Sequence, residues 1–97
     1  MDVSVIIVNY KTKQLTLDAI QSVFDKTEAI DYEIIVVDND SQDGSIEHLQ
    51  DKFNDRIEII NAGSNLGFGK ANNLALKKAK GKYVFLLKQF HSHKQYF

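Results

Sequence analysis

The clearest indication of the fold is one stretch of thirteen residues, Tyr32-Glu-Ile-Ile-Val-Val-Asp-Asn-Asp-Ser-Gln-Asp-Gly44. Its first half, residues 32–37, is a short and mostly β-branched apolar run, which is typical of a strand covered on both faces in a parallel sheet. Its second half, residues 38–44, is a cluster of residues that favour turns and helix caps. The stretch therefore predicts a buried strand that ends in a polar loop.

The same alternation extends along the chain on both sides of this stretch. Further strands are predicted at residues 3–8, 56–60 and 82–87. Three apolar faces at helical spacing lie between the strands: Leu15, Ala19, Ile20 and Val23; Ile46, Leu49 and Phe53; and Ala71, Leu74, Ala75 and Ala79. Asp43 or Ser45 is the expected N-cap of the second helix, and Gly81 is the expected C-cap of the third. Strands that alternate with single helices predict an α/β, Rossmann-like three-layer sandwich, with helices on both faces of a mostly parallel sheet.

Composition excludes several classes of function. The 97 residues are 43% hydrophobic and 26% charged, which is typical of one globular domain. The formal net charge of -1 is spread along the chain, so nucleic acid is not an expected partner. The chain has no Cys, which excludes disulfides and thiolate zinc sites. No apolar run approaches the roughly 20 residues of a membrane span, and we expect a cytoplasmic protein without a transmembrane segment.

Three polar loops are expected to meet at one edge of the sheet. They follow the first three predicted strands, and ligands of open parallel sheets bind beyond the carboxyl ends of the strands. Tyr10, in the first loop, could stack on a base or simply pack on the first helix. Asp38, in the second, could accept a hydrogen bond from the imide N–H of uracil or thymine, or act as a turn or cap residue. In the third loop, Asn65 is a candidate to contribute its amide, and so are Asn72 and Asn73 just after it.

Two motif-like features fit known sites poorly. Acidic residues at alternate positions before Gly44 suggest a calcium loop, but the register puts Asn39 first and Gln50 twelfth, where a carboxylate is needed. The Gly67-Phe-Gly69 segment is half of a dinucleotide fingerprint, yet the third glycine position holds Asn72. A tight loop that brings a helix close to the sheet accounts for these glycines better.

The order and spacing of four motifs resemble the opening of the family 2 glycosyltransferases, which have the GT-A fold. The four motifs are Val3-Ser-Val-Ile-Ile-Val-Asn-Tyr10, Ile34-Ile-Val-Val-Asp-Asn-Asp-Ser-Gln-Asp-Gly-Ser45, Asn65-Leu-Gly-Phe-Gly-Lys-Ala-Asn-Asn73 and Gly81-Lys-Tyr-Val-Phe-Leu-Leu87. The third is similar to the rhamnosyltransferase-like subgroup, which uses UDP-linked or dTDP-linked sugars for bacterial surface polysaccharides. The resemblance covers residues 3–87.

The resemblance implies a nucleotide-sugar site and a transferase activity. Val8 and Tyr10 would line the base pocket, Asp38 would bond the pyrimidine, and Asp40 would lie close to the ribose. The donor would be a nucleoside-diphosphate sugar, and the acceptor a saccharide or a lipid-linked saccharide. In the family a divalent metal, Mn²⁺ or Mg²⁺, is held on the diphosphate by an Asp-x-Asp-like element after the fourth strand.

The chain departs from the family where that metal element is expected. Its sequence there is Lys88-Gln-Phe90, and a lysine has the wrong charge for a metal ligand. His91 and His93 follow, but Lys94 is adjacent and no third ligand is evident. We therefore expect residues 1–87 to be the nucleotide-sugar-binding part of a truncated GT-A domain, with no catalytic or metal-binding residue, and residues 88–97 to be an irregular tail. The alternatives are a nucleotide-binding module without catalysis and a homo-oligomer formed through exposed sheet edges.

Overall fold

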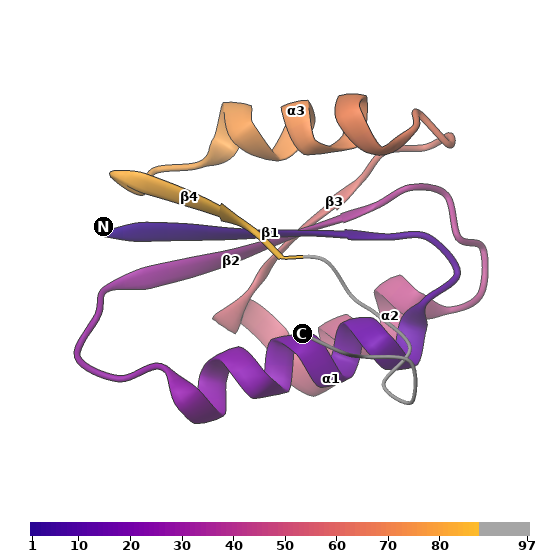
Figure 1. The fold of residues 1–97 in the computed structure, drawn as a ribbon. Coiled ribbons are helices and arrows are strands. Elements are labelled where there is room, and N and C mark those ends of the chain that lie inside the picture. The colour runs from indigo at the N-terminus through magenta and orange to yellow at the C-terminus, as the bar shows by residue number, and fades with distance from the viewer. Residues whose placement is uncertain (88–97) are drawn as a thin grey trace, which may run out of the picture.

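The four strands form a single parallel sheet with the order β3-β2-β1-β4 (Figure 1). A computed structural model of the chain describes residues 1–87. The elements are β1 (Val3–Asn9), α1 (Lys13–Lys26), β2 (Tyr32–Asp38), α2 (Ser45–Phe53), a 3₁₀ turn (Asn54–Arg56), β3 (Glu58–Asn61), α3 (Phe68–Lys78) and β4 (Tyr83–Leu86). The α/β class, the parallel sheet and the alternation of strands with helices are confirmed.

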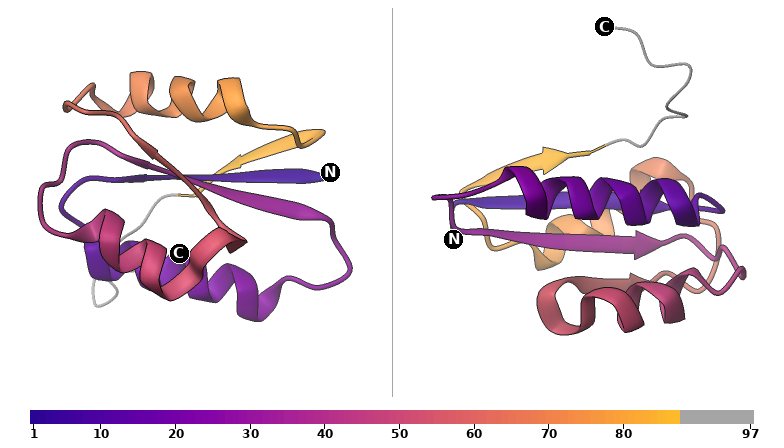
Figure 2. Two further views of the ribbon diagram at one scale, coloured as in Figure 1. Left: turned by 180° about the vertical axis from the view of Figure 1, so that it is seen from behind. Right: turned by 90° about the horizontal axis from the view of Figure 1, so that it is seen from below.

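Helices cover both faces of the sheet, as the sequence predicts. Helices α1 and α2 lie on one face and α3 lies alone on the other (Figures 1 and 2). This arrangement explains why β1 and β2, the two inner strands, are apolar at successive positions: each needs apolar side chains on both faces. The two predicted buried strands are therefore the central pair of a three-layer sandwich.

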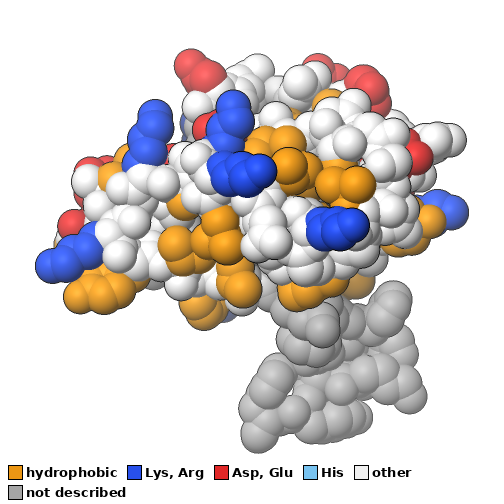
Figure 3. Space-filling view, turned by 90° about the horizontal axis from the view of Figure 1, so that it is seen from above, with side chains coloured by type: hydrophobic (Ala, Val, Ile, Leu, Met, Phe, Trp, Pro, Cys, Tyr) orange, Lys and Arg blue, Asp and Glu red, His pale blue; other side chains and the backbone are white. Residues whose placement is uncertain are grey.

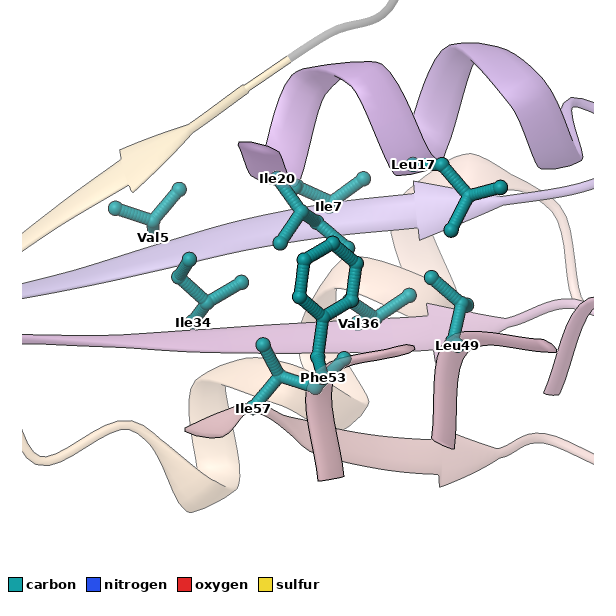
Figure 4. Close-up of a cluster of buried hydrophobic side chains, with 9 residues drawn as sticks. All are labelled: Val5, Ile7, Leu17, Ile20, Ile34, Val36, Leu49, Phe53 and Ile57. Carbon is teal, nitrogen blue, oxygen red and sulfur yellow. The ribbon is translucent and has the colours of Figure 1, made fainter. Parts of the chain in front are cut away.

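The larger core layer lies between the sheet and the pair α1 and α2 (Figure 4). Phe53 of α2 is 1% exposed, and its ring lies 5.7 Å from that of Phe24 on α1, centroid to centroid. The members of this layer come from both helices, both inner strands and the segment before β3: Val5, Ile7, Leu17, Ile20, Ile34, Val36, Leu49, Phe53 and Ile57.

The smaller core layer lies under α3 and is built from small side chains. Ala71 and Ala75 of α3 pack against Ile6, Ile35 and Val37. Alanines on the inner face of a helix let its backbone approach the sheet closely. The loop that leads into α3 is therefore also held close to the sheet.

Two predicted helix caps are wrong. Residue Gly44, with φ of 80°, is the N-cap of α2, and Ser45 is already the first helical residue. Helix α3 ends at Lys78 with Ala79 as its C-cap, so Gly81 does not cap it. Gly81 instead lies against β1, where an added Cβ would stand 2.4 Å from the backbone nitrogen of Ser4. A glycine is needed at position 81 because the turn before β4 lies close to the backbone of β1, and not because a helix ends there.

The predicted strand boundaries need small corrections. The third strand begins at Glu58 and not at residue 56, because Asn54–Arg56 continue α2 as a 3₁₀ turn. The fourth strand is Tyr83–Leu86, one residue shorter at each end than predicted. The expected tail at residues 88–97, with His91 and His93, lies outside the described residues.

Candidate functional site

The loops that follow β1, β2 and β3 meet at the carboxyl edge of the sheet. The parallel register aligns Asn9 with Asp38 and Asp38 with Asn61, so the three strand ends lie side by side. Backbone hydrogen bonds continue past the strands, from Asn39 N to Asn9 O at 2.8 Å and from Ala62 N to Asp38 O at 3.0 Å. The predicted convergence of the three polar loops is confirmed.

A buried polar cluster centred on Asp38 fixes these loops. Asp38 is 3% exposed, and its Oδ1 accepts from Asn9 Nδ2 at 2.7 Å and from Ser41 Oγ at 2.8 Å. Its Oδ2 accepts from the backbone N–H of Ser41 at 3.2 Å. A buried carboxylate needs such donors to offset its desolvation. Three of its roughly four lone-pair directions are thus used within the protein, and one on Oδ2 is left over.

The opposite side of Asn9 ties the cluster to the start of α1. Asn9 Oδ1 accepts hydrogen bonds from Thr12 Oγ1 at 3.0 Å and from Thr16 Oγ1 at 2.8 Å. Asn9 itself is fully buried. One amide therefore spans β1, α1 and the loop after β2, which makes this part of the rim rigid.

Asn39, which the sequence reasoning did not single out, holds the third loop in place. Its Nδ2 donates to Asn65 Oδ1 at 2.9 Å, and its Oδ1 accepts from the backbone N–H of Leu66 at 2.8 Å. Asn65 Oδ1 also accepts from Gly67 N at 3.0 Å. Asn65, a predicted site residue, thus lies at the rim in contact with the loop after β2. The available sequence signal was the position of Asn39 directly after Asp38, within a run already assigned to the rim.

A hollow with an uncharged lining opens between β1, the loop after β2 and the start of α3. Its volume is about 270 Å³, and it is lined by Val8, Tyr10, Thr12, Asn39, Asn65, Gly67 and Phe68. Three predicted site residues, Val8, Tyr10 and Asn65, therefore share one hollow. It combines a flat aromatic ring with amide groups, which suits a heterocycle that both stacks and forms hydrogen bonds.

A second, more open hollow lies on the other side of Tyr10. It has a volume of about 560 Å³ and is lined by Tyr10, Lys11, Asp40, Ser41, Gln42 and Asp43. Lys11 Nζ lies 5.3 Å from the centre of the Tyr10 ring. Asp40 has a φ of 68° and accepts from Gln42 Nε2 at 3.0 and 3.1 Å. Asp40 and Asp38 also line a smaller hollow of about 170 Å³ near Asn61.

The two remaining asparagines do not line these three hollows. Asn72 is 6% exposed on the inner face of α3, and its Oδ1 has no hydrogen-bond partner within the described part of the chain. Asn73 is exposed on the same helix. Their expected contribution to the rim therefore stays a prediction.

Asp43 lies directly before Gly44, the N-cap of α2, and its side chain contacts the first residue of the helix. Its Oδ1 accepts from the Oγ of Ser45 and, at 3.0 Å, from the backbone N–H of Ser45. The hydrogen bond from the Ser45 hydroxyl is the main reason why the pKa of Asp43 lies below its usual value. The side chain is exposed, so solvent weakens this effect.

Comparison with known proteins gives the family. A model of the family described as "Glycosyl transferase family 2" matches residues 4–88. The chain belongs to glycosyl transferase family 2.

Two of the similar family 2 glycosyltransferases have names that refer to teichuronic acid and to poly(ribitol-phosphate). TuaG of Bacillus subtilis, named a teichuronic acid biosynthesis glycosyltransferase, is 37% identical over 87 residues, covering 88% of this chain and 34% of TuaG. A poly(ribitol-phosphate) beta-N-acetylglucosaminyltransferase, TarS of Staphylococcus aureus, is 32% identical over 94 residues, covering 90% of this chain and 16% of TarS. The chain thus spans about a third or less of the length of these relatives.

Solved structures of this family share the fold. TarS residues 1–349 in complex with UDP superpose with a TM-score of 0.80 at 25% identity, covering 92% of this chain and 27% of the TarS chain. The complex of the same protein with UDP-GlcNAc also gives a TM-score of 0.80, at 26% identity. The GT-A fold implied by the resemblance is confirmed.

Members of family 2 generally use a divalent metal, and the residues described here do not fit one. Residues 1–87 contain no group of three or more His, Cys, Asp or Glu side chains that could hold an ion. At the carboxyl end of β4, where the resemblance implies acidic ligands, the chain has Leu86 and Leu87 and continues with Lys88. Mg²⁺ and Mn²⁺ need oxygen ligands, which these side chains lack. Along the same 87 residues, none of the helices is both long and apolar enough to cross a bilayer.

Proposed function

We propose that this chain binds the nucleoside of a UDP-linked or dTDP-linked sugar and forms the donor-binding part of a glycosyltransferase. The main support is the hollow in which Val8, Tyr10 and Asn65 come together with Asn39 at the carboxyl edge of the sheet. The fold match to TarS, which was solved with UDP and UDP-GlcNAc, supports the same ligand class. The names of the relatives, which refer to teichuronic acid biosynthesis and to poly(ribitol-phosphate), support a role in bacterial polysaccharide synthesis. We extend the proposal to a saccharide or lipid-linked acceptor and to a cytoplasmic location.

In this proposal the pyrimidine stacks on Tyr10 and forms hydrogen bonds with amide groups and with a carboxylate. Tyr10 is 40% exposed and lines the hollow, so its ring can be reached by a ligand there. The Asn39 and Asn65 amides can serve the carbonyl groups of the base. Asp38 is 3% exposed and lines the smaller hollow near Asn61 and not the hollow beside Tyr10. Its remaining lone-pair direction on Oδ2 would have to be reached from there to accept the imide N–H. Asp40, in the adjoining hollow, would contact the ribose hydroxyls.

For the chain by itself we expect binding without sugar transfer. The metal of the family, Mn²⁺ or Mg²⁺, would stabilise the leaving diphosphate, but the carboxyl end of β4 offers no oxygen ligand for it. The affinity would then depend on the nucleoside contacts. A stack and one or two hydrogen bonds give a few kcal/mol, which corresponds to a dissociation constant on the order of 1 mM.

Nucleotide titration followed by amide chemical shifts tests the nucleoside site. We expect UDP to shift the amides of Tyr10, Asn39 and Asn65 without added metal. Tyr10→Ala should abolish the shifts, while Tyr10→Phe should keep them, because the ring is retained. Leu76→Ala is the matched control, since Leu76 is exposed on α3 and lines none of the hollows described. No shift in the wild-type chain at several millimolar UDP would refute the proposal.

A binding module without catalysis is the second candidate, favoured by the leucines at the end of β4. Both candidates predict that this chain alone transfers no sugar. Transfer of radiolabelled sugar from a UDP-sugar or dTDP-sugar by this chain, with manganese present, would establish catalysis and contradict our expectation of binding alone.

A further inference from the structure

The ring of Tyr10 lies next to a residue with a strained backbone. Tyr10 lines both the uncharged hollow and the more open one beside it, so its side chain separates the two. The next residue, Lys11, has a φ of 56°, in the left-handed region that residues other than glycine rarely adopt. Such a conformation persists only where surrounding contacts hold it. The position of the Tyr10 ring therefore depends on the contacts that hold Lys11.

The hydroxyl of Ser41, in the loop after β2, holds the backbone of Lys11. Its Oγ accepts hydrogen bonds from Lys11 N at 2.8 Å and from Asn9 Nδ2 at 3.2 Å. It donates its proton to Asp38 Oδ1 at 2.8 Å, with the more distant Asn9 O at 3.4 Å. A hydroxyl has one proton and two lone pairs, so the hydrogen-bonding capacity of Ser41 Oγ is used within the protein. Ser41 is also only 3% exposed, so its hydroxyl is not available to a ligand.

The backbone on both sides of Ser41 has the same left-handed conformation as Lys11. The φ of Asp40 is 68° and that of Gln42 is 55°. Between them, the N–H of Ser41 donates to Asp38 Oδ2 at 3.2 Å. All three left-handed residues line the more open hollow. Strained backbone is concentrated at ligand sites in proteins, and here one buried hydroxyl joins two such segments.

We propose that Ser41 is a positioning residue of the nucleoside site. By holding the N–H of Lys11 it fixes the Tyr10 ring opposite Asn39 and Asn65, which line the same hollow. Ser41 contacts no base itself. A ring that is already in place loses less freedom when a base stacks on it, so Ser41 raises the affinity for the nucleotide. This inference rests on the proposed function, because it concerns the geometry of the same site.

Ser41→Ala tests this role with two NMR measurements. Hydrogen exchange of the Lys11 amide should become about tenfold faster or more, because the amide loses its acceptor. The dissociation constant for UDP should rise about 3–10-fold, because the Tyr10 ring is no longer held in place. Dispersed amide signals from β1 and β2 would show that the variant is folded.

Thr16→Val is the matched control for a purely structural effect. It also removes a buried hydroxyl that bonds to Asn9, at 2.8 Å from Asn9 Oδ1, but on the side of α1. It should lower the free energy of unfolding without changing the Lys11 exchange rate or the affinity for UDP. Lys77→Ala, on the exposed side of α3 where basic side chains lie at the surface, should change none of these values (Figure 3). Equal weakening of UDP binding by Ser41→Ala and Thr16→Val would overturn the proposal.

A second variant, Ser41→Cys, keeps the test decisive if Ser41→Ala does not fold. The thiol fills the space of the hydroxyl but is a weak hydrogen-bond donor and acceptor, so both measured values should move in the same direction as in Ser41→Ala. An unchanged Lys11 exchange rate or an unchanged UDP affinity in a folded Ser41 variant would overturn this inference alone. Absence of UDP-induced shifts in the wild-type chain would instead refute the nucleoside site, and this inference with it.

Discussion

The carboxylate of Asp38 shows how one residue can be structural and still lie where a ligand contact is expected. It accepts three hydrogen bonds from Asn9 and Ser41 while almost fully buried. Removing it would leave donors of Asn9 and Ser41 without a partner in a buried place, which is more costly than losing the bonds alone.

Asp38→Ala should therefore lower the free energy of unfolding by about 1–3 kcal/mol. Urea denaturation of the variant and the wild-type chain measures the difference. Asp40→Asn is the matched control, because Asp40 bonds only with the exposed Gln42 side chain in the described structure and Asn also tolerates its φ of 68°, and it should change stability by less than about 0.5 kcal/mol. An equal effect of the two changes would show that the buried cluster is not what holds the rim.

The residue scale also shows where sequence reasoning reached its limit. Tyr10, Val8 and Asn65 could be placed at the rim because strand ends are readable from apolar runs. Asn39 could not be separated from its polar neighbours, since a run of Asp, Asn and Ser does not reveal which side chain points into the protein and which to the ligand side. Two tertiary hydrogen bonds, one donated by Asn39 to Asn65 and one accepted by Asn39 from the Leu66 amide, decide that question.

Alanine substitutions at two glycines are expected to change the stability of the protein in opposite directions. Gly81→Ala puts a Cβ against the β1 backbone and should destabilise the protein by about 1–3 kcal/mol. Gly69→Ala, inside α3 with nothing within 4 Å of the new Cβ, should stabilise it by about 0.5–1 kcal/mol, because alanine favours the helix. Thermal unfolding of the pair compares the signs directly. A stabilising Gly81→Ala would contradict the close contact between this turn and β1.

At the scale of elements, the start of α2 is stabilised by Asp43, which lies before the first turn of the helix. The depressed pKa of Asp43 means that its charged form is stabilised by folding, so this contribution is present above the unfolded pKa. It is lost as the pH falls through the lower, folded pKa. Asp43 is not the N-cap of α2, but its hydrogen bonds with Ser45 lie at the same helix end, and in this exposed place their loss should cost about 0.5 kcal/mol.

We therefore expect Asp43→Asn to be less stable than the wild-type chain at pH 7, and the difference to shrink as the pH falls below 3.8, the usual pKa of an Asp, and through the lower pKa of the folded state. Unfolding by urea at several pH values tests the convergence. Asp51→Asn serves as the control, being an exposed acid later in the same helix. A difference between wild type and Asp43→Asn that persists at low pH would indicate an uncharged role for the side chain.

Element boundaries were predicted less well than element types. The apolar run of residues 32–37 fixed β2 correctly, since no other structure buries so many successive β-branched residues in so few positions. The run of residues 82–87 also predicted a strand, but nothing in it distinguishes a buried strand from the exposed edge that β4 proves to be. The predicted end of α3 was wrong because Gly81 makes a tertiary contact with Ser4 and does not cap the helix.

At the scale of the whole molecule, stability depends mainly on the layer between the sheet and α1 and α2. Phe53 lies at its centre and joins α2 to α1 and to both inner strands (Figure 4). Phe53→Ala should cost about 3–5 kcal/mol, a large part of the stability of so small a domain. Leu74→Ala, at a half-buried position on the α3 side, should cost much less. Denaturation midpoints of the two variants test this asymmetry, which would be wrong if both lost equal stability.

The strand order also bears on how the chain is made. The central strand, β1, is the first to leave the ribosome, yet Val3 pairs with Tyr83, which is synthesised 80 residues later. At about 5–20 residues per second, this neighbour arrives roughly 4–16 seconds after β1. Until Tyr83 is synthesised, β1 can be paired with β2 on one side only. The nascent chain is therefore more open to wrong pairing, and more in need of a chaperone, before β4 emerges than after it.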